Sequence, residues 1–236
     1  ISAEQAKFYF DDARNITKAD LAGNVQLNTE SAMLDSHTAH VLFAKGTDGK
    51  VRPEAFTTDE KTKLTQQSGS KFQKPSVFKA EKIDYDIQTQ KTLARGPVEF
   101  TFYTSDSQND LPVVITATEN AEFLTLENMI IFNGNVKGIS PKQAGNMMQQ
   151  DSFSSDKLIV YLYENAKGQK SLKHVTITHG KPRLESEKYL NGVKISHVRL
   201  DCQQVDYDED MKLVAAQGPG EIQLNNEKVP DSSGAD

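Results

Sequence analysis

The chain has 236 residues, a formal net charge of −6 at pH 7 and a hydrophobic content of 36%. This acidity argues against a nucleic-acid partner, because binding to a phosphate backbone needs clustered Lys and Arg side chains. The hydrophobic fraction is low for this length, which indicates an elongated shape or long polar loops. Because the chain begins at Ile1 and contains no membrane-length apolar run, we interpret it as a mature or truncated product with a targeting or anchoring segment upstream.

The first patterned segment, residues 21–27, reads Leu-Ala-Gly-Asn-Val-Gln-Leu. Apolar residues alternate along it with a period of two, which predicts a β-strand. Residues 34–41 form a second predicted strand and contain His37 and His40. Their odd spacing places the two imidazoles on opposite faces of the sheet. We therefore expect solvent-facing histidines, no shared metal ion and no cofactor.

Residues 46–76 lack a sustained apolar period and begin Gly-Thr-Asp-Gly-Lys-Val-Arg-Pro. A long stretch without regular patterning is typical of a functional loop or a mobile segment. We expect a polar insertion here, either mobile or a frayed repeat.

Two later segments share one pattern: Ala-Glu-Lys-Ile-Asp-Tyr-Asp at residues 80–86 and Cys-Gln-Gln-Val-Asp-Tyr-Asp at residues 202–208. Each continues, after a short polar link, into a second segment that contains Ala-x-Gly-Pro, at residues 94–97 and 216–219. In both copies, twelve positions separate the first aspartate from the glycine. The link is too short for a packed helix, so each copy predicts a β-hairpin.

The paired aspartates of these copies, Asp84 with Asp86 and Asp206 with Asp208, could in principle bind calcium or act as catalytic carboxylates. Their recurrence favours a structural role, since an active site occurs once per domain whereas a hairpin residue repeats with the hairpin. An aspartate at a turn entrance can accept hydrogen bonds from the local backbone. We expect these aspartates to serve the hairpins.

Weaker copies of the second segment occur elsewhere, each marked by a glycine. The separations of the marker glycines, 73, 38, 46 and 38 residues, indicate one unit of about 37 to 46 residues, with the first interval spanning two units. The missing marker is expected within the insertion at residues 46–76. Residues 139–152 contain a proline and two adjacent methionines and are predicted to be a loop between units, and residues 225–236 are predicted to be a flexible tail. The marker glycines are Gly23, Gly96, Gly134, Gly180 and Gly218.

The phrase Leu-Ala-x-Gly-x-Val-x-Phe after an Ala-x-x-Ile-x-Tyr-Asp strand resembles the OstA-like repeat of the lipopolysaccharide-transport proteins. Residues 21–25 and 132–136 are similar to its Gly-Asn-Val signature. The resemblance covers roughly residues 5–224 apart from the insertion. It departs from the family at Pro97 and Pro219, which replace the Asn of the signature, so a bulge or an edge position is expected there.

The resemblance implies an all-β fold, an elongated antiparallel β-jellyroll of stacked hairpins folded like a taco over residues 1–224. It also implies a periplasmic protein of outer-membrane biogenesis in a Gram-negative bacterium, either a soluble bridge or a component anchored to the inner membrane. Such a protein binds lipopolysaccharide in an apolar groove and joins related β-jellyroll proteins by pairing of edge strands. No enzymatic activity is implied.

Alternation along the glycine-marked strands selects the side chains expected to line that groove. Side chains two positions apart share a face, so Val98, Phe100 and Phe102 lie on the side of Gly96, and Glu99 lies on the other side. The glycine is expected to keep the face shallow and leave room for an acyl chain. The predicted groove residues are Val25, Leu27, Val98, Phe100, Phe102, Val136 and Ile222.

Two functions of other classes remain open from the residues alone. One is a structural or adhesive β-solenoid with a dry interior, and the other is a glycan-processing enzyme on a β-scaffold. Asp35, Ser36 and His37 have the composition of a catalytic triad, but neighbours along a strand point away from one another. The single cysteine, Cys202, is expected to be a buried structural thiol. Basic residues beside the glycines, including Arg95, are expected on the solvated outer face.

Overall fold

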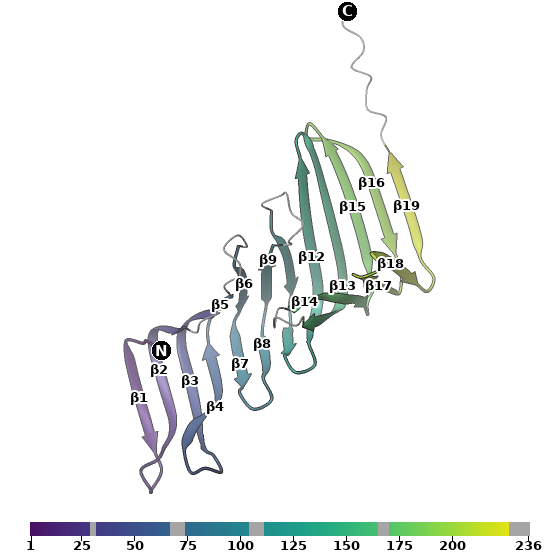
Figure 1. Ribbon diagram of the computed structural model, residues 1–236. Helices are drawn as coiled ribbons and strands as arrows, with labels where there is room; N and C mark the ends of the chain where they lie inside the picture. Colours follow the sequence, from purple (N-terminus) through teal and green to yellow (C-terminus); the bar gives the residue numbers. More distant parts are fainter. Residues whose placement is uncertain (29–31, 67–73, 104–110, 165–169, 227–236) are drawn as a thin grey trace, which may run out of the picture.

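The computed structural model describes residues 1–28, 32–66, 74–103, 111–164 and 170–226. Within these residues the chain forms nineteen β-strands in one antiparallel sheet and no helix, which confirms the predicted all-β fold (Figure 1). The strands are β1 (Gln5–Phe10), β2 (Ile16–Asn28), β3 (Ala32–Lys45), β4 (Val51–Asp59), β5 (Thr62–Gln66), β6 (Ser76–Ala80), β7 (Lys82–Asp86), β8 (Lys91–Arg95), β9 (Val98–Phe102), β10 (Val113–Ala117), β11 (Asn120–Leu124), β12 (Met129–Ala144), β13 (Met147–Glu164), β14 (Lys170–Thr178), β15 (Arg183–Leu190), β16 (Val193–Asp201), β17 (Gln204–Asp208), β18 (Leu213–Gln217) and β19 (Glu221–Asn226).

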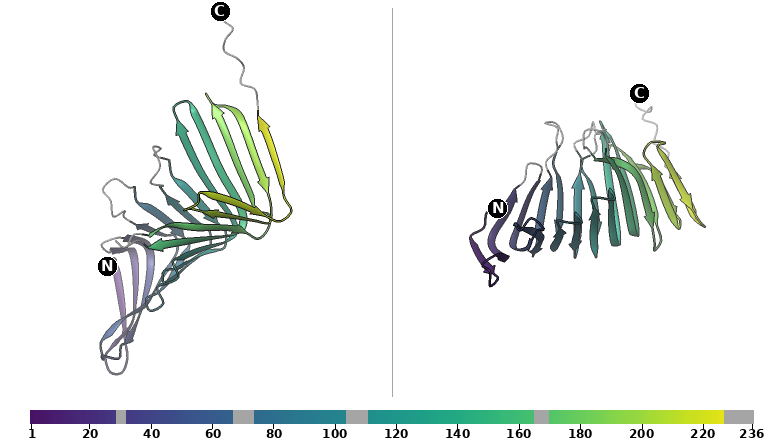
Figure 2. Two further views of the ribbon diagram at one scale, coloured as in Figure 1. Left: turned by 45° about the vertical axis from the view of Figure 1, so that its right-hand side comes forward. Right: turned by 60° about the horizontal axis from the view of Figure 1, so that its bottom comes forward.

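The sheet is folded along its length into two walls that meet at a corner (Figure 2). Wall A consists of β1, β4, β7, β8, β11, β14, β17 and β18. Wall B consists of β5, β6, β9, β10, β15, β16 and β19. The four long strands β2, β3, β12 and β13 run through the corner, and each contributes one half to each wall.

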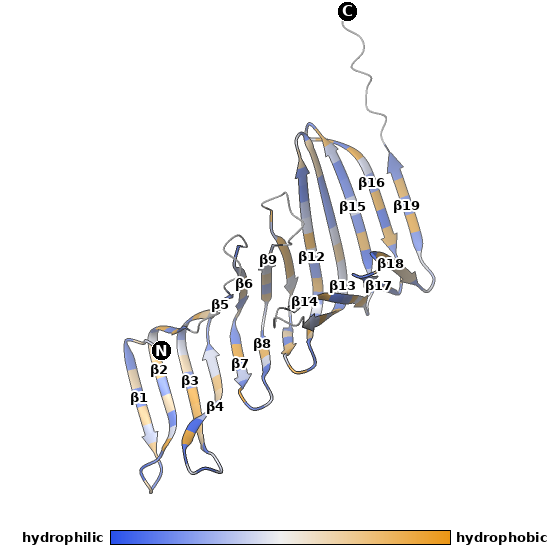
Figure 3. Ribbon diagram, in the orientation of Figure 1, coloured by the Kyte–Doolittle hydropathy of each residue, from blue (hydrophilic) through white to orange (hydrophobic). Residues whose placement is uncertain are grey.

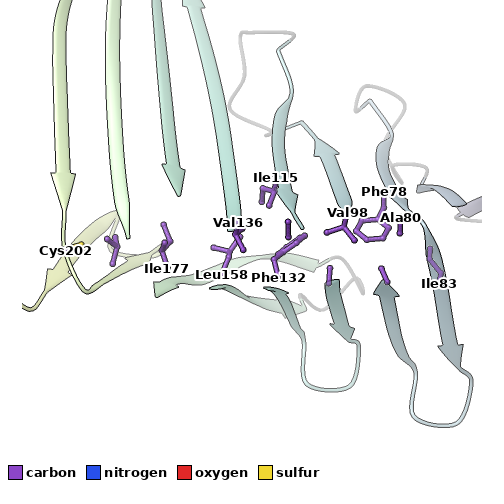
Figure 4. Packing of buried hydrophobic residues seen from close by; sticks show 14 residues of the cluster. Phe78, Ala80, Ile83, Val98, Ile115, Phe132, Val136, Leu158, Ile177 and Cys202 are labelled. Carbon is purple, nitrogen blue, oxygen red and sulfur yellow. The ribbon is translucent and has the colours of Figure 1, made fainter. Parts of the chain in front are cut away.

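One apolar row follows each wall from strand to strand next to the corner. Within a row every residue is the register partner of the next, so the side chains share one face, called here the inner face. The rows of the two walls pack against each other along the corner and form the core (Figure 4). The wall A row is Ala6, Leu21, Ala39, Thr58, Ile83, Ala94, Ala121, Phe132, Leu158, Ile177, Val205 and Ala216.

The corner of β2 and of β12 explains the Gly-Asn pairs of the sequence. Gly23 and Asn24 have φ angles of 73° and 46°, and Gly134 and Asn135 have 81° and 41°. Two consecutive residues in the left-handed region turn the chain sharply, and Gly and Asn are the residues that adopt this region at least cost. The register of each strand shifts at this point, so the pair forms a bulge that bends one continuous strand from wall A into wall B.

The Gly-Pro corners behave differently because proline cannot adopt a positive φ. At Gly96, with φ 79°, only the glycine is left-handed, and the chain divides into the separate strands β8 and β9. A Cβ on Gly96 would lie 2.5 Å from a carboxylate oxygen of Glu81, which is exposed on the outside of the corner. The glycine is therefore required by the turn and by this neighbour. The expectation that it leaves space for a ligand on the inner face is wrong.

Of the two interpretations of residues 46–76, the mobile insertion is contradicted by the part that forms β4 and β5, which supports a divergent repeat. These strands pair with β3 and continue into the sheet through β7 and β6, as any other layer does. Their corner is formed by Glu60 and Lys61, both left-handed at φ 67° and 37°. Glu60 lies 37 residues after Gly23 and 36 before Gly96, so it occupies the missing marker position without being glycine. The absent glycine concealed the repeat.

The predicted loop at residues 139–152 is also wrong, because β12 and β13 extend through it and only residues 145 and 146 form the turn. Pro141 is tolerated because β10 pairs with β12 no further than Ile139, so that β13 is the one described strand that pairs with β12 at this position. Residues 67–73 of the predicted insertion and residues 227–236 of the predicted tail lie outside the described residues. The end of β19 extends the fold by two residues beyond the expected boundary at 224.

The predicted hairpins are confirmed, since β7 pairs with β8, β11 with β12 and β17 with β18. The Asp86 carboxylate accepts hydrogen bonds from the backbone N–H groups of Gln88 and Thr89, and these bonds lower its pKa. Asp208 likewise accepts one from the Met211 N–H. As expected, these aspartates stabilise the turns of their hairpins.

Candidate functional site

The inner face of wall B carries an unbroken row of side chains that crosses every strand of the wall. Each member lies two residues further from the corner than the corner residue of its strand. The members share a face because they are register partners. We call it the wall B ladder. Its members are Leu27, Leu34, Leu64, Phe78, Phe100, Ile115, Gly138, Phe153, Leu184, Leu200 and Ile222. At the one position without a side chain, Gly138, the Phe153 ring occupies the space that a Cβ would need.

In the middle of the molecule the two inner faces touch. The ring of Phe78 on wall B meets that of Phe123 on wall A edge-on at a centroid distance of 4.9 Å. The Phe100 ring stacks on Phe102 at 5.1 Å and lies 6.5 Å from Phe132 of wall A. Such aromatic pairs add to the stabilisation gained from burial alone. The interior is therefore closed by side chains at this level.

The seven predicted groove residues all lie on the inner face of wall B, but at different depths. Val25, Val98 and Val136 are fully buried at the corner, with at most 2% of their surface exposed. Leu27, Phe100 and Phe102 are half-buried, and Ile222 is 66% exposed. A ligand that enters between the walls as they stand meets the second group and not the three valines.

The sequence prediction missed the inner face of wall A. There the row above the corner includes Phe123, Val160, Val175 and Tyr207, which lie on the same face as the wall A core residues two positions away. The repeated Ile-x-Tyr and Ala-x-Phe patterns of the sequence could have indicated this second apolar face. These patterns belong to the first strand of each predicted hairpin, whereas the groove was assigned from the second strand only.

Hydrophobic residues occur in the strands at both ends of the sheet (Figure 3). Several of their side chains are exposed on the inner face. Phe8 and Phe10 are more than half exposed on β1, which among the described strands pairs only with β2. Ile222 and Leu224 are each 66% exposed on β19, and all residues of β18 are exposed. In the described part of the chain β18 and β19 each have a single strand partner. Each end of the described sheet thus presents a strand that has one unpaired edge and apolar side chains.

The outer face of the walls is polar and paired by charge. Asp20 lies 2.8 Å from the Lys18 ammonium and 2.6 Å from His40 Nδ1, and these contacts hold its pKa far below the usual range. His40 Nε2 is 3.0 Å from Asp59, so the imidazole bridges two carboxylates. Arg95 pairs with Asp84 at 2.8 Å, as expected for the solvated face. These contacts orient surface side chains and contribute little stability each.

The expectation that His37 and His40 lie on opposite faces is wrong, because both lie on the outer face. The alternation of β3 shifts at the corner between Ser36 and Ala39, which are both buried. Ser36 is buried on the inner face, where its hydroxyl donates to the Thr38 carbonyl at 3.0 Å, whereas His37 is exposed. Cys202 is buried at the corner, as expected, and burial raises the pKa of its thiol. Among the described residues, no group of three His, Cys, Asp or Glu side chains is arranged to hold a metal ion.

Shallow cavities on the described surface include the following two. One, of about 530 Å³, lies at the tips of the β12–β13 and β15–β16 hairpins and includes Met147, Met148 and Tyr189. The other, of about 300 Å³, lies around the corner near His37 and Lys61.

Within the described residues no helix is both long and apolar enough to cross a membrane. Comparisons with protein-family models, with curated proteins and with solved structures give no match.

Proposed function

We propose that the protein carries lipopolysaccharide across the periplasm by shielding acyl chains on the inner faces of its two walls. The wall B ladder is the observation that carries this proposal. Ten strand-to-strand steps separate Leu27 from Ile222, so at the usual strand spacing the ladder is about 48 Å long. Exposing one acyl chain of about a dozen carbons to water costs on the order of 10 kcal/mol, and a long apolar face offsets that cost.

Lipid extraction tests the proposal directly. The protein is purified from its native envelope fraction, extracted with organic solvent and examined for lipid A by mass spectrometry. Co-purified lipid A in stoichiometric amount supports the proposal, and its absence from protein that has been incubated with lipopolysaccharide contradicts it.

Photo-crosslinking on one strand locates the bound lipid. A photoreactive residue is placed at Phe100 or Phe102, which face inward on β9, and at Glu99 or Thr101, which face outward on the same strand. Strong adducts at the first pair and weak ones at the second are expected. Equal labelling on both faces would show that the apolar side is only a dry core.

The exposed ends support a further part of the proposal, that related β-jellyroll proteins add their strands to β1 and to β18 and β19 to form a bridge. An unpaired strand edge with apolar side chains favours such pairing. The chain would then be one segment of a longer apolar path, either soluble or anchored at the inner membrane.

A second candidate is a structural β-solenoid that binds other proteins through its outer surface. The contact of Phe78 with Phe123 favours it, because the two walls are already packed against each other in the middle. Under this alternative neither lipid extraction nor inward crosslinking gives a signal. The two experiments above therefore separate the candidates.

A further inference from the structure

The strands β12, β13 and β15 extend far from the corner (Figure 1). On these strands the inner face of wall B changes from apolar to polar with distance from the corner. The ladder positions of these strands are Gly138, Phe153 and Leu184. Beyond them, the next two inner rows are polar. Ser140, Asp151 and Ser186 are register partners in the first row, and Lys142, Gln149 and Lys188 in the second. We call these six residues the inner polar patch.

Hydrogen bonds organise the patch around one carboxylate. Asp151 Oδ1 accepts from Gln149 Nε2 and from the Ser186 hydroxyl, both at 2.7 Å, and Oδ2 lies 3.3 Å from the Lys142 ammonium. Partial burial by itself would raise the pKa of Asp151, but these hydrogen bonds and the ammonium outweigh it and lower the pKa. The carboxylate is thus ionised and held in place at neutral pH.

The two lysines extend beyond the carboxylate toward solvent. Lys142 and Lys188 are exposed and lie on either side of Gln149 in the same row. Two strand spacings separate them, about 10 Å between backbones. With Asp151 the patch has a net charge of +1, in a protein whose net charge is −6.

The position of the charges is unusual for this face. Elsewhere on the inner face of wall B, the described members of these rows are apolar, hydroxyl or amide side chains, such as Phe102, Val113 and Val198. A charge on a surface that covers an acyl chain must be paired or must meet a polar group of the ligand. The combination of ammonium, amide, hydroxyl and carboxylate groups matches a head group that has both hydroxyls and negative charge.

We propose, on the basis of the lipid-carrying function above, that the inner polar patch binds the head group of the lipid. The acyl chains lie on Phe153, Leu184 and Val198, closer to the corner or further along the wall. Lys142 and Lys188 bind phosphate or another anionic group, while the Gln149 amide donates to Asp151 and Ser186 between them. Asp151 orients Gln149 and Lys142 and offers its carboxylate to ligand hydroxyls. The patch thereby fixes which way the amphiphile lies.

Two probes with the same sixteen-carbon chain test this assignment: lysophosphatidylglycerol, which has a phosphate, and monopalmitoylglycerol, which has hydroxyls only. Binding of each is measured by calorimetry below its micellar concentration, with the full chain. The test variant is Lys142→Gln with Lys188→Gln. The matched control, Lys63→Gln with Lys137→Gln, removes two exposed lysines from the outer face of the same wall.

We expect the test variant to bind the phosphate probe about tenfold more weakly, as for loss of charge-assisted hydrogen bonds. Its affinity for monopalmitoylglycerol and its melting temperature should stay at the wild-type values, and the control variant should bind both probes as the wild type does. Equal affinities of wild type and test variant for both probes would overturn the head-group site while leaving the carrier function intact. Failure of the wild type to bind either amphiphile would overturn both. An equal loss in the control variant would show that only general charge attraction acts.

Discussion

The middle and the C-terminal end of the sheet share the same alternation of apolar and polar residues, but they bury their apolar side chains to different extents. In the middle, from β6 to β12, the inner faces meet through Phe78 and Phe123, and core residues such as Ala121 and Phe132 are fully buried. At the end, Leu224 on β19 and Val214 on β18 are at least half exposed. The difference teaches that a row of apolar residues becomes core only where both the opposite wall and the next strand cover it.

The largest expected difference between the two regions is in stability. Replacing Phe132 by Ala should lower the free energy of unfolding by about 3–5 kcal/mol, because the ring is fully buried and its loss leaves a cavity. Ile222→Ala, at a position 66% exposed, should change it by less than about 0.5 kcal/mol. Urea unfolding followed by circular dichroism measures both. Equal losses would mean that the C-terminal end is covered in solution by another copy or partner.

A second comparison concerns a corner and a hairpin tip. Gly134 and Gly145 both have positive φ angles, 81° and 58°, but a Cβ on Gly134 would overlap the Glu119 side chain, whereas nothing lies within 4 Å of one on Gly145. Gly145→Ala should therefore cost only the backbone term, about 1 kcal/mol, and Gly134→Ala about 2–3 kcal/mol. Thermal unfolding of the two variants gives the difference.

Removing the obstructing side chain sharpens this test. The double variant Gly134→Ala with Glu119→Ala removes the two closest contacts, with the Cγ and Cδ atoms of Glu119, and should recover much of the steric part, although the Cβ at position 119 remains 2.9 Å away. A double variant as unstable as Gly134→Ala alone would show that the turn itself, and not the contact with Glu119, requires the glycine.

The fold was predictable from the sequence where local chemistry dictates it. The Ile-x-Tyr-Asp strands and their polar links each have a local physical cause, and both appear in the structure as expected. The Gly-Asn pairs were noticed as markers of the repeat, but their role as the corners of the sheet was not predicted. The corner at Glu60 and Lys61 was not predictable, because these residues adopt the left-handed region only under the constraint of the flanking strands. Residues 139–152 were misjudged because a proline is tolerated where a strand has one neighbour.

The candidate site was predictable in part. Alternation placed Val98, Phe100 and Phe102 on one face, as the structure has them. Alternation could not predict how far each side chain is buried. The burial of Val98 and the exposure of Ile222 depend on which strands of the opposite wall or of the next layer cover them. The inner polar patch was missed because Lys142 and Gln149 fall within the segment that was expected to be a loop.

The smallest expected effect is the pH dependence of the C-terminal end, whose outer face is held partly by ion pairs. Hydrogen bonds from Arg183 and Arg199, each 2.7 Å away, hold the pKa of Asp201 below its usual value. A carboxylate whose pKa is lower in the folded than in the unfolded chain stabilises the fold above the unfolded value, near 4, and loses that contribution as the pH falls through the folded pKa. Since these groups are partly exposed, we expect less than about 1 kcal/mol from the pair. Between pH 5 and 3, the protection factors of amides in β15, β16 and β19, corrected for the intrinsic exchange rate at each pH, should therefore fall before those in β8 and β11, whose core is apolar. Asp201→Asn should remove part of this acid dependence and leave exchange in the middle of the sheet unchanged. Simultaneous loss of protection in both regions would mean that the sheet unfolds as one cooperative unit and that the open end is no weaker than the closed middle.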